Sequence, residues 1–339
     1  MRKYLIVSIL VVLANIQLQG QNIAACMKEN GQWGYVDSTG KFFIPPNYSG
    51  CQDFSEGLAA VKIKGKWGYI DLKGKVVIPA TLEGVQPFSQ GLARIKRGSV
   101  WGFMDKSGKI VIEPSFEQVG NFNEGLAKIK IGDNWGFIDK TGKVIVQPTF
   151  GAAKNFKEGL AMVKSDGKWG AIDKTGKIVI QPTFGGCQDF SEGYAAVRVN
   201  GTWGYIDKTG NFIIQPTLEG AEPFSQGLAR ARNEKAWGYI DKTGNFVIQP
   251  AFEGAGNFSE GLARARNAKE WGYIDKSGKL VIAPQFEVAK NFKEGMALVR
   301  INGKWGFIDK TGKYVISPQF EAAREFKKTN NDSSEEEEE

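Results

Sequence analysis

The residues of this chain that are best suited to bind a ligand form two rows with a fixed spacing. Nine tryptophans stand 34 residues apart, at Trp33, Trp67, Trp101, Trp135, Trp169, Trp203, Trp237, Trp271 and Trp305. From the second tryptophan onward a basic residue stands five positions earlier, at Lys62, Lys96, Lys130, Lys164, Arg198, Arg232, Arg266 and Arg300. If a two-residue turn joins the strands, each cation lies directly opposite its tryptophan. We call these two rows the tryptophan–cation ladder.

Two interpretations of the ladder are open at this point. In the first, each cation covers an indole in a cation–π contact, which contributes about 0.5–1 kcal/mol at an exposed site. In the second, the ladder binds a polymer that repeats anionic or sugar units. The second interpretation requires the tryptophans to lie on an exposed face of the molecule.

The other polar residues do not form a catalytic or metal-binding set. The chain has no histidine, which excludes triads and metal sites that depend on imidazole. A glutamate recurs once per repeat before a glycine, where it can orient a turn, at Glu56, Glu124, Glu158, Glu192, Glu260 and Glu294. Single carboxylates of this kind do not make an acid/base pair. We therefore expect no enzymatic activity, no cofactor and no metal site.

A second recurring phrase, Asp-Lys-Thr-Gly-Lys, is typical of a tight hairpin turn. The glycine suits the left-handed position of a three-residue loop, and the aspartate can accept hydrogen bonds from the turn amides. We expect structural roles for the aspartates and glycines of this turn, exemplified by Asp71, Gly74, Asp139, Gly142, Asp207 and Gly210. A calcium loop would need several oxygen ligands close together, and each turn offers one acid.

The period of 34 residues indicates a tandem-repeat architecture. Glycine and proline are too frequent for helix pairs, and the apolar residues are mainly Val, Ile, Phe and Tyr, which favour strands. The unit at 58–79 is predicted to contain strands at 58–63, 66–71 and 75–79. Strand alternation places Ile70, Val76 and Ile78 on one face of the unit.

Both faces of such a unit are apolar, so neighbouring units must stack. The segment 147–159 is predicted to be a connector, with one helical turn, whose Phe150 and Phe156 fill the core between layers; equivalent aromatics are Phe184, Phe190, Phe286 and Phe292. We expect an all-β protein of stacked three-stranded meanders that forms an open solenoid or superhelix. The alternative is a closed, propeller-like ring, for which nine units exceed the usual 4–8 blades.

The ends of the chain differ from the repeats. Residues 1–21 resemble a secretory signal peptide, with Arg2 and Lys3 before an apolar run, and residues 327–339 form an acidic tail expected to be disordered. The repeat array occupies 22–326, with a partial last unit, and no transmembrane segment is expected after removal of the signal. Without residues 1–21 and 330–339 the net charge is +11, which attracts polyanions. Export argues against a specific nucleic-acid partner.

The three cysteines are Cys26, Cys51 and Cys187. Ile23-Ala24-Ala25-Cys26 resembles a lipobox, which would make Cys26 a lipidated residue; the alternative is a small buried thiol in the first strand. Cys51 and Cys187 occupy equivalent positions 136 residues apart, which cannot meet in an open array. We therefore expect free thiols.

The repeated phrase Trp-Gly-Tyr/Phe-Ile-Asp-Lys-Thr-Gly-Lys, followed by Val-Ile-x-Pro and Phe-x-Glu-Gly-Leu-Ala, resembles the bacterial WG repeat, also called the KWG repeat. The resemblance covers roughly 27–326; the first unit lacks the Phe-x-Glu-Gly-Leu-Ala half, and Ala171 replaces the aromatic residue of one motif. It implies a β-rich, often exported repeat protein without general enzymatic activity, and it supplies no catalytic residues. A looser likeness links the aromatic hairpins to choline- and glucan-binding wall repeats.

Three functions are compatible with these features. The first is a protein-interaction scaffold in the cell envelope, because repeat arrays present extended surfaces. The second is a module that binds cell-wall or envelope glycans through the tryptophan–cation ladder, and the third is a spacer without a ligand. Export to the periplasm, the cell surface or the medium is expected, with a lipoprotein anchored at Cys26 as the alternative.

Overall fold

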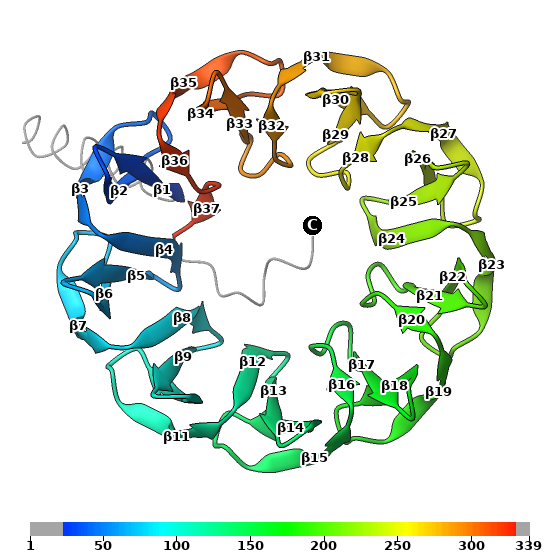
Figure 1. Ribbon diagram of the computed structural model, residues 1–339, viewed down its shortest axis with the longest axis horizontal. Helices are drawn as coiled ribbons and strands as arrows, with labels where there is room; N and C mark the ends of the chain where they lie inside the picture. The colour runs from blue at the N-terminus through cyan, green and yellow to red at the C-terminus, as the bar shows by residue number, and fades with distance from the viewer. Residues whose placement is uncertain (1–22, 330–339) are drawn as a thin grey trace, which may run out of the picture.

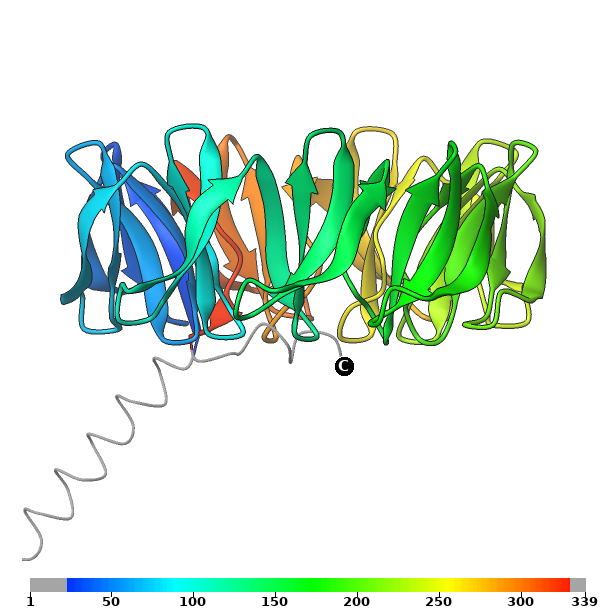
Figure 2. The same cartoon turned by 90° about the horizontal axis from the view of Figure 1, so that it is seen from below.

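The computed structural model describes residues 23–329, which fold into 37 β-strands and contain no helix. The strands form nine antiparallel sheets, which are arranged like blades around a central axis (Figure 1). Seen from the side, the molecule is a flat ring with turns along both rims (Figure 2). The chain is therefore a closed β-propeller. The predicted open solenoid is wrong, and the propeller-like ring that we held as the alternative is confirmed.

Each blade has four strand positions from the centre outward. The inner strands are β36 (Ala322–Ala323), β37 (Lys327–Lys328), β4 (Gly50–Ser55), β8 (Gly84–Ser89), β12 (Gln118–Asn123), β16 (Ala152–Ala153), β20 (Gly186–Cys187), β24 (Gly220–Ser225), β28 (Gly254–Ala255) and β32 (Val288–Ala289). The second strands are β1 (Ile23–Glu29), β5 (Leu58–Ile63), β9 (Leu92–Arg97), β13 (Leu126–Ile131), β17 (Leu160–Ser165), β21 (Ala195–Val199), β25 (Leu228–Asn233), β29 (Leu262–Asn267) and β33 (Ala297–Ile301).

The tryptophans lie on the third strands, β2 (Gln32–Val36), β6 (Lys66–Ile70), β10 (Val100–Asp105), β14 (Asn134–Asp139), β18 (Lys168–Asp173), β22 (Thr202–Ile206), β26 (Ala236–Ile240), β30 (Glu270–Asp275) and β34 (Lys304–Ile308). The outer strands are β3 (Phe42–Tyr48), β7 (Val76–Leu82), β11 (Ile110–Phe116), β15 (Val144–Phe150), β19 (Ile178–Phe184), β23 (Phe212–Leu218), β27 (Phe246–Phe252), β31 (Leu280–Phe286) and β35 (Tyr314–Phe320). We number the blades from blade 1, which contains β1–β3, through blade 2 (β4–β7) to blade 9 (β32–β35).

The predicted three-stranded unit is one strand too small, because the supposed connector is itself β-structure. Its first part extends the outer strand β15 past Pro148 to Phe150. Its next part is β16, which pairs with β17 through Ala152↔Lys164 and Ala153↔Val163. The same segment therefore ends one blade and begins the next, and the expected helical turn is not formed.

The two ends of the described chain close the ring together. Strand β1 of blade 1 pairs with β36 through Met27↔Ala323 and with β37 through Ala24↔Lys327. The first repeat lacks an inner strand and the last repeat is a half unit, so each supplies what the other lacks. The repeat fold consequently continues through Thr329, beyond the boundary at 326 that the sequence indicated.

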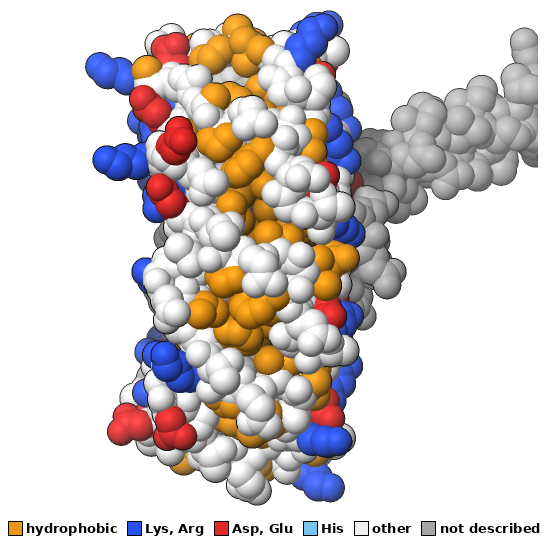
Figure 3. Space-filling view, turned by 90° about the vertical axis from the view of Figure 1, so that its right-hand side faces the viewer, with side chains coloured by type: hydrophobic (Ala, Val, Ile, Leu, Met, Phe, Trp, Pro, Cys, Tyr) orange, Lys and Arg blue, Asp and Glu red, His pale blue; other side chains and the backbone are white. Residues whose placement is uncertain are grey.

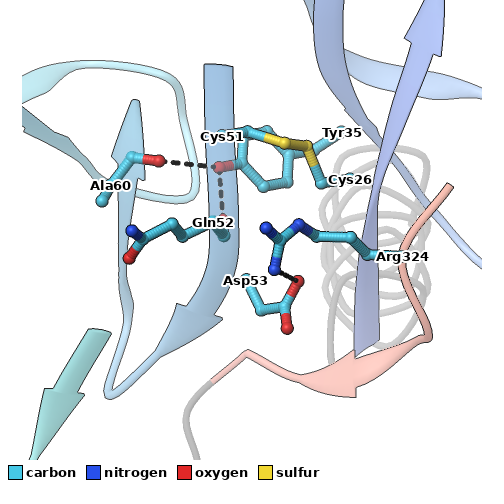
Figure 4. The surroundings of a disulfide bond; sticks show 7 residues. All are labelled: Cys26, Tyr35, Cys51, Gln52, Asp53, Ala60 and Arg324. Carbon is cyan, nitrogen blue, oxygen red and sulfur yellow. Dashed lines mark hydrogen bonds and ion pairs between the residues drawn. A yellow bond between two sulfur atoms is a disulfide. The ribbon is translucent and has the colours of Figure 1, made fainter. Parts of the chain in front are cut away.

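A disulfide joins Cys26 of blade 1 to Cys51 of blade 2, with their Cα atoms 6.6 Å apart (Figure 4). The expectation of three free thiols is therefore wrong for this pair, because the two cysteines lie in adjacent blades and not four blades apart. Cys187 is free and buried, as expected. Cys26 is fully buried with its sulfur bonded to Cys51, which places it in the core and leaves no thiol for a lipid.

Polar contacts reinforce the same blade boundary. The Tyr35 hydroxyl donates to the carbonyl oxygen of Gln52 at 2.7 Å, and Arg324 Nη1 lies 3.6 Å from Asp53 Oδ1 (Figure 4). Both contacts connect blade 1, which is built from the two chain ends, to blade 2.

The core of the ring lies between the blades. Phe137 of blade 4 packs against Phe156 of blade 5 with ring centroids 4.8 Å apart, and both side chains are about 1% exposed. The six connector aromatics that the sequence assigned to the core are all buried. Where Ala171 replaces the usual aromatic residue, Met162 joins the same buried cluster. Stacking of neighbouring units is therefore confirmed as the way in which the apolar faces are covered.

The glycine after each tryptophan is explained by a close approach of two strands. A Cβ atom on Gly68 would lie 2.5 Å from the carbonyl oxygen of Ile78 on the outer strand. A side chain at this position would collide with the backbone of the same blade.

Candidate functional site: the tryptophan face

All nine tryptophans lie near one rim of the ring, beside the turns that join the second and third strands. We call this rim the tryptophan face. In blade 2, Trp67 pairs with Lys62, and Lys62 pairs with Gly50. A Cβ atom on Gly50 would lie 3.3 Å from Trp67 Cη2 and 3.3 Å from Lys62 Cβ, so the indole extends across the second strand toward the inner one. The predicted register, with each cation opposite its tryptophan, is correct.

All nine tryptophans are half-buried. Trp169 of blade 5 packs on a cluster that includes Phe184 of its own blade and Phe190 of blade 6. One part of the indole therefore stabilises a blade boundary, and the remaining part is exposed to solvent. The ladder combines elements of both interpretations that the sequence left open.

Five ladder cations lie against their own tryptophan. The distances from the charged group to the ring centroid are 5.9 Å for Lys62, 5.8 Å for Lys96, 5.7 Å for Arg232, 5.1 Å for Arg266 and 5.9 Å for Arg300. Within residues 23–329, no such contact is found for Lys130, Lys164 or Arg198. For the ladder cations, the cation–π interpretation therefore describes blades 2, 3, 7, 8 and 9.

Sequence reasoning missed two groups of basic residues on this face. Lys28 pairs with Trp33 in blade 1 and completes the ladder at nine positions; the same offset of five residues would have found it. A second row stands seven residues before four of the tryptophans, at Arg94, Lys128, Arg230 and Arg264.

The second row connects neighbouring blades. Arg94 Nη1 donates to Val119 O at 2.8 Å, and Lys128 Nζ donates to Ala153 O at 3.0 Å, in each case on the inner strand of the next blade. Lys128 also lies 4.9 Å from the centroid of Trp135. Burial lowers the pKa values of Arg94 and Lys128. These cations are structural, because each of the four donates a hydrogen bond to a backbone carbonyl of the next blade.

A row of glutamates at the start of the inner strands closes several second-to-third-strand turns. Glu83 accepts from Gly98 N at 2.6 Å, Glu117 from Gly132 N at 3.2 Å and Glu287 from Gly303 N at 3.2 Å. Glu287 also accepts from Arg300 Nε at 2.9 Å, and this hydrogen bond is the main reason that its pKa is lowered. In these blades the tryptophan face binds a carboxylate of its own chain.

Comparison with known proteins identifies the repeat. The family model for the WG containing repeat matches residues 33–67, 67–100, 101–135, 135–169, 169–203, 203–235, 237–269, 271–305 and 305–330. The chain belongs to the WG-repeat family. No curated protein matches the sequence.

Solved structures share the propeller fold of these WG repeats. The crystal structure of a eukaryotic initiation factor is similar at a TM-score of 0.63 and 12% identity, over 89% of this chain and 98% of that one. The dihydro-heme d1 dehydrogenase NirN in complex with DHE is similar at a TM-score of 0.53 and 12% identity, over 92% of this chain and 76% of that one. At such identities the similarity concerns the fold alone.

We call the opposite rim of the WG-repeat ring the turn face. Its charged side chains form hydrogen bonds and ion pairs between neighbouring blades. Glu56 accepts from Gly91 N of the next blade at 3.1 Å and lies 2.9 Å from Lys106 Nζ. Gln90 occupies the same position one blade on and accepts from Gly125 N at 2.9 Å. The recurring glutamates therefore hold neighbouring blades together.

The aspartate turns also lie on the turn face, where the aspartate side chains accept hydrogen bonds from the turn residues. Asp139 Oδ1 accepts from Thr141 N at 2.9 Å, Thr141 Oγ1 at 2.6 Å and Lys143 N at 3.0 Å. Gly142 has a φ of +88°, in the left-handed region. The hydrogen bond from the Thr141 hydroxyl is the largest cause of the lowered pKa of Asp139.

The outer wall is the remaining exposed surface. It carries a band of apolar side chains between charged residues toward both rims (Figure 3). The band comes from the outer strands, where side chains such as Val77, Val179 and Val247 are more than two-fifths exposed. Each of the nine outer strands contains a proline, which removes a backbone donor and discourages pairing with another chain.

Two features of the described chain bear on ligands and membranes. Among residues 23–329, no group of three His, Cys, Asp or Glu side chains is placed to hold a metal ion. The same residues include no helix that is long and apolar enough to cross a membrane.

Proposed function

We propose that the protein is a non-enzymatic, exported scaffold of the cell envelope, which binds a protein partner on its tryptophan face. The observation that carries this proposal is the ladder itself: nine half-buried tryptophans, each opposite a basic residue, arranged around one rim. Tryptophan and arginine are enriched among the residues that dominate the energy of protein interfaces. Membership of the WG-repeat family supports a repeat-based binding role.

The second candidate function is binding of a cell-wall or envelope glycan. The partial exposure of the indoles favours it, because sugar rings pack on aromatic side chains, and the cations would suit anionic sugars. Under this alternative the repeating ladder matches a repeating polymer.

Export from the cell is part of the proposal. The segment that resembles a signal peptide, residues 1–21, and the acidic residues 330–339 lie outside the described residues. The Cys26–Cys51 disulfide is consistent with export, because disulfides persist in oxidising compartments. The location can be checked by fractionating cells that express the full chain and probing each fraction.

The function can be tested by capture on immobilised protein at low and at physiological salt. One arm offers solubilised envelope proteins and the other offers isolated wall sacculi with envelope polysaccharide. A variant with Lys164→Gln and Arg198→Gln changes the ladder, and a control with Lys174→Gln and Lys208→Gln removes the same charge from the turn face. Protein capture that survives physiological salt and fails only in the ladder variant supports the scaffold. Ladder-dependent retention of sacculi alone supports the glycan alternative, and retention only at low salt rejects both.

A further inference from the structure

The glutamates at the start of the inner strands are missing from particular blades. Gly151 and Gly185 stand at this position in the adjacent blades 5 and 6, and Ser49 stands there in blade 2. The serine hydroxyl of blade 2 donates to the carbonyl oxygen of Lys62 at 3.1 Å. Blades 5 and 6 therefore form a sector in which no side chain fills the place of the glutamate.

The backbone of this sector matches that of a blade that has the glutamate. Gly185 N donates to Arg198 O at 2.8 Å, just as Glu287 N donates to Arg300 O at 3.0 Å. The turn residues Asn200 and Gly201 have φ values of +49° and +96°, and their counterparts Asn302 and Gly303 have +49° and +73°. The backbone amide of Gly201 therefore has the same orientation in its turn as that of Gly303, and Arg198 stands at the position of Arg300.

Blade 9 shows what such a site binds. The Glu287 carboxylate accepts from Gly303 N and from Arg300 Nε together, so one carboxylate meets a backbone amide and a guanidinium. Charge-assisted hydrogen bonds of this kind are stronger than neutral ones. In blade 6, Arg198 Nε instead donates to Gly201 O at 3.2 Å, within its own hairpin. No carboxylate of the described chain pairs with Arg198 or with Lys164.

We propose that blades 5 and 6 carry two adjacent open carboxylate sites, which bind neighbouring acidic side chains of the protein partner. The proposal rests on the scaffold function and specifies the chemistry of the segment that is bound. The occupant is a glutamate-like side chain because that is what the equivalent site holds in blades 3, 4 and 9. Blade 6 is the stronger site, since the turn of blade 5 contains Asp166, whose carboxylate accepts from Ser165 Oγ at 3.3 Å.

The chain offers a direct way to fill the site. A Cβ atom on Gly185 would have only an ordinary contact, 3.6 Å from Arg198 O, and the residue has no left-handed φ, so a side chain fits without strain. Gly185→Glu should place the chain's own carboxylate on Gly201 N and Arg198. Gly185→Ala tests the backbone change alone, and Thr183→Glu puts the same charge on the exposed outer strand of blade 5.

The experiment measures binding of a fluorescein-labelled hexaglutamate peptide by anisotropy at physiological salt. Gly185→Glu should weaken binding at least tenfold, while Gly185→Ala and Thr183→Glu stay within about twofold of the parent. Glu287→Gly should tighten binding by opening an equivalent site in blade 9, whereas Glu113→Gln, with the same charge change on the outer wall, should not. Equal weakening by Gly185→Glu and Thr183→Glu would overturn the proposal, because only general electrostatics would remain.

A second arm uses a galacturonate hexamer, which carries the same carboxylates on a sugar backbone. Binding of this oligomer alone, lost in Gly185→Glu, would overturn the protein partner and support the glycan alternative. Capture of envelope proteins that continues unchanged in Gly185→Glu would reject the site and keep the scaffold function. Loss of hexaglutamate binding in that variant without any capture of envelope proteins would keep the site and reject the scaffold.

Discussion

In blades 5 and 6, the charged side chains of the two rims make different kinds of contact. On the turn face, Glu158 of blade 5 accepts from Gly193 N of blade 6 at 3.0 Å and lies 3.0 Å from Lys208 Nζ. On the tryptophan face, the Arg198 side chain donates to Gly201 O of its own hairpin, and in blade 9 the side-chain contacts of Glu287 also stay within one blade. Charges on the turn face therefore hold blades together. On the tryptophan face, the ladder cations and the glutamates at the start of the inner strands make their contacts within one blade, so their partners can change from blade to blade without opening the ring.

The largest expected effect concerns the disulfide that joins blade 1 to blade 2. Cys51→Ser removes a cross-link between residues 25 positions apart and should lower the free energy of unfolding by about 3 kcal/mol. Chemical denaturation with and without reductant measures this effect. Cys187→Ser is the control and should keep the sensitivity to reductant of the parent. If reductant did not change the stability of the parent protein, this result would contradict the presence of the disulfide.

The next effect tests whether the tryptophan face is also part of the fold. Trp169→Ala should lower the free energy of unfolding by about 2–3 kcal/mol, somewhat less than for a fully buried aromatic side chain, because the indole is half-buried between blades 5 and 6. Lys168→Ala, at the exposed neighbouring position, is the control. An unchanged melting temperature would mean that the tryptophans do not pack in the core and that their whole side chains are available to a ligand.

A smaller effect sharpens the role of the turn face. Glu158→Ala removes both the bond to Gly193 N and the ion pair to Lys208, and should cost about 1 kcal/mol. Glu158→Gln should cost only a few tenths of a kcal/mol, because Gln90 and Gln226 make the same amide contact in other blades. Urea denaturation of the two variants measures the difference. Equal losses would show that the ion pair, and not the amide contact, matters.

The smallest effect per residue is a dependence on pH that arises on the turn face. The pKa values of Asp139, Asp173 and Asp309 are lowered, chiefly by hydrogen bonds from threonine hydroxyls. Their stabilising contribution is complete above the unfolded pKa of about 3.9 and is lost as the pH falls through the lower folded values. The melting temperature should therefore be steady from pH 7 to pH 5 and fall below about pH 4. Asp139→Asn should lessen that fall, and a decline already complete at pH 5 would contradict this origin.

Features that depend on the repeat itself could be predicted from the sequence. The strand type, the aspartate turns and the pairing of Lys62 with Trp67 all follow from local spacing and turn chemistry. The inner strand could not be predicted, because β16 and its equivalents are two residues long in several blades and resemble a connector. Alternation also failed on the outer strand: Ile78 pairs with Tyr69 across two shifts in register and does not share the side of Ile70.

Ring closure and the open carboxylate sites could not be predicted from the sequence, because they depend on contacts between residues that are far apart in the chain. The curvature that brings β36 and β37 to β1 depends on the packing of every blade, which a single repeat does not reveal. The missing glutamates at Gly151 and Gly185 were visible in the sequence, but their meaning was not. Only the contacts of Glu287 in the folded chain show that this position binds Arg300 and a turn amide.

The most direct test of the division between the two faces compares matched double variants in blades 5 and 6. Lys164→Gln with Arg198→Gln changes the tryptophan face, and Lys174→Gln with Lys208→Gln breaks ion pairs to Glu124 and Glu158 on the turn face. Hexaglutamate affinity and melting temperature are measured for both. The first variant should lose at least tenfold in affinity with an unchanged melting temperature, and the second should melt about 2 °C lower with near-parent affinity. Equal losses of affinity in both variants would contradict a binding function confined to the tryptophan face.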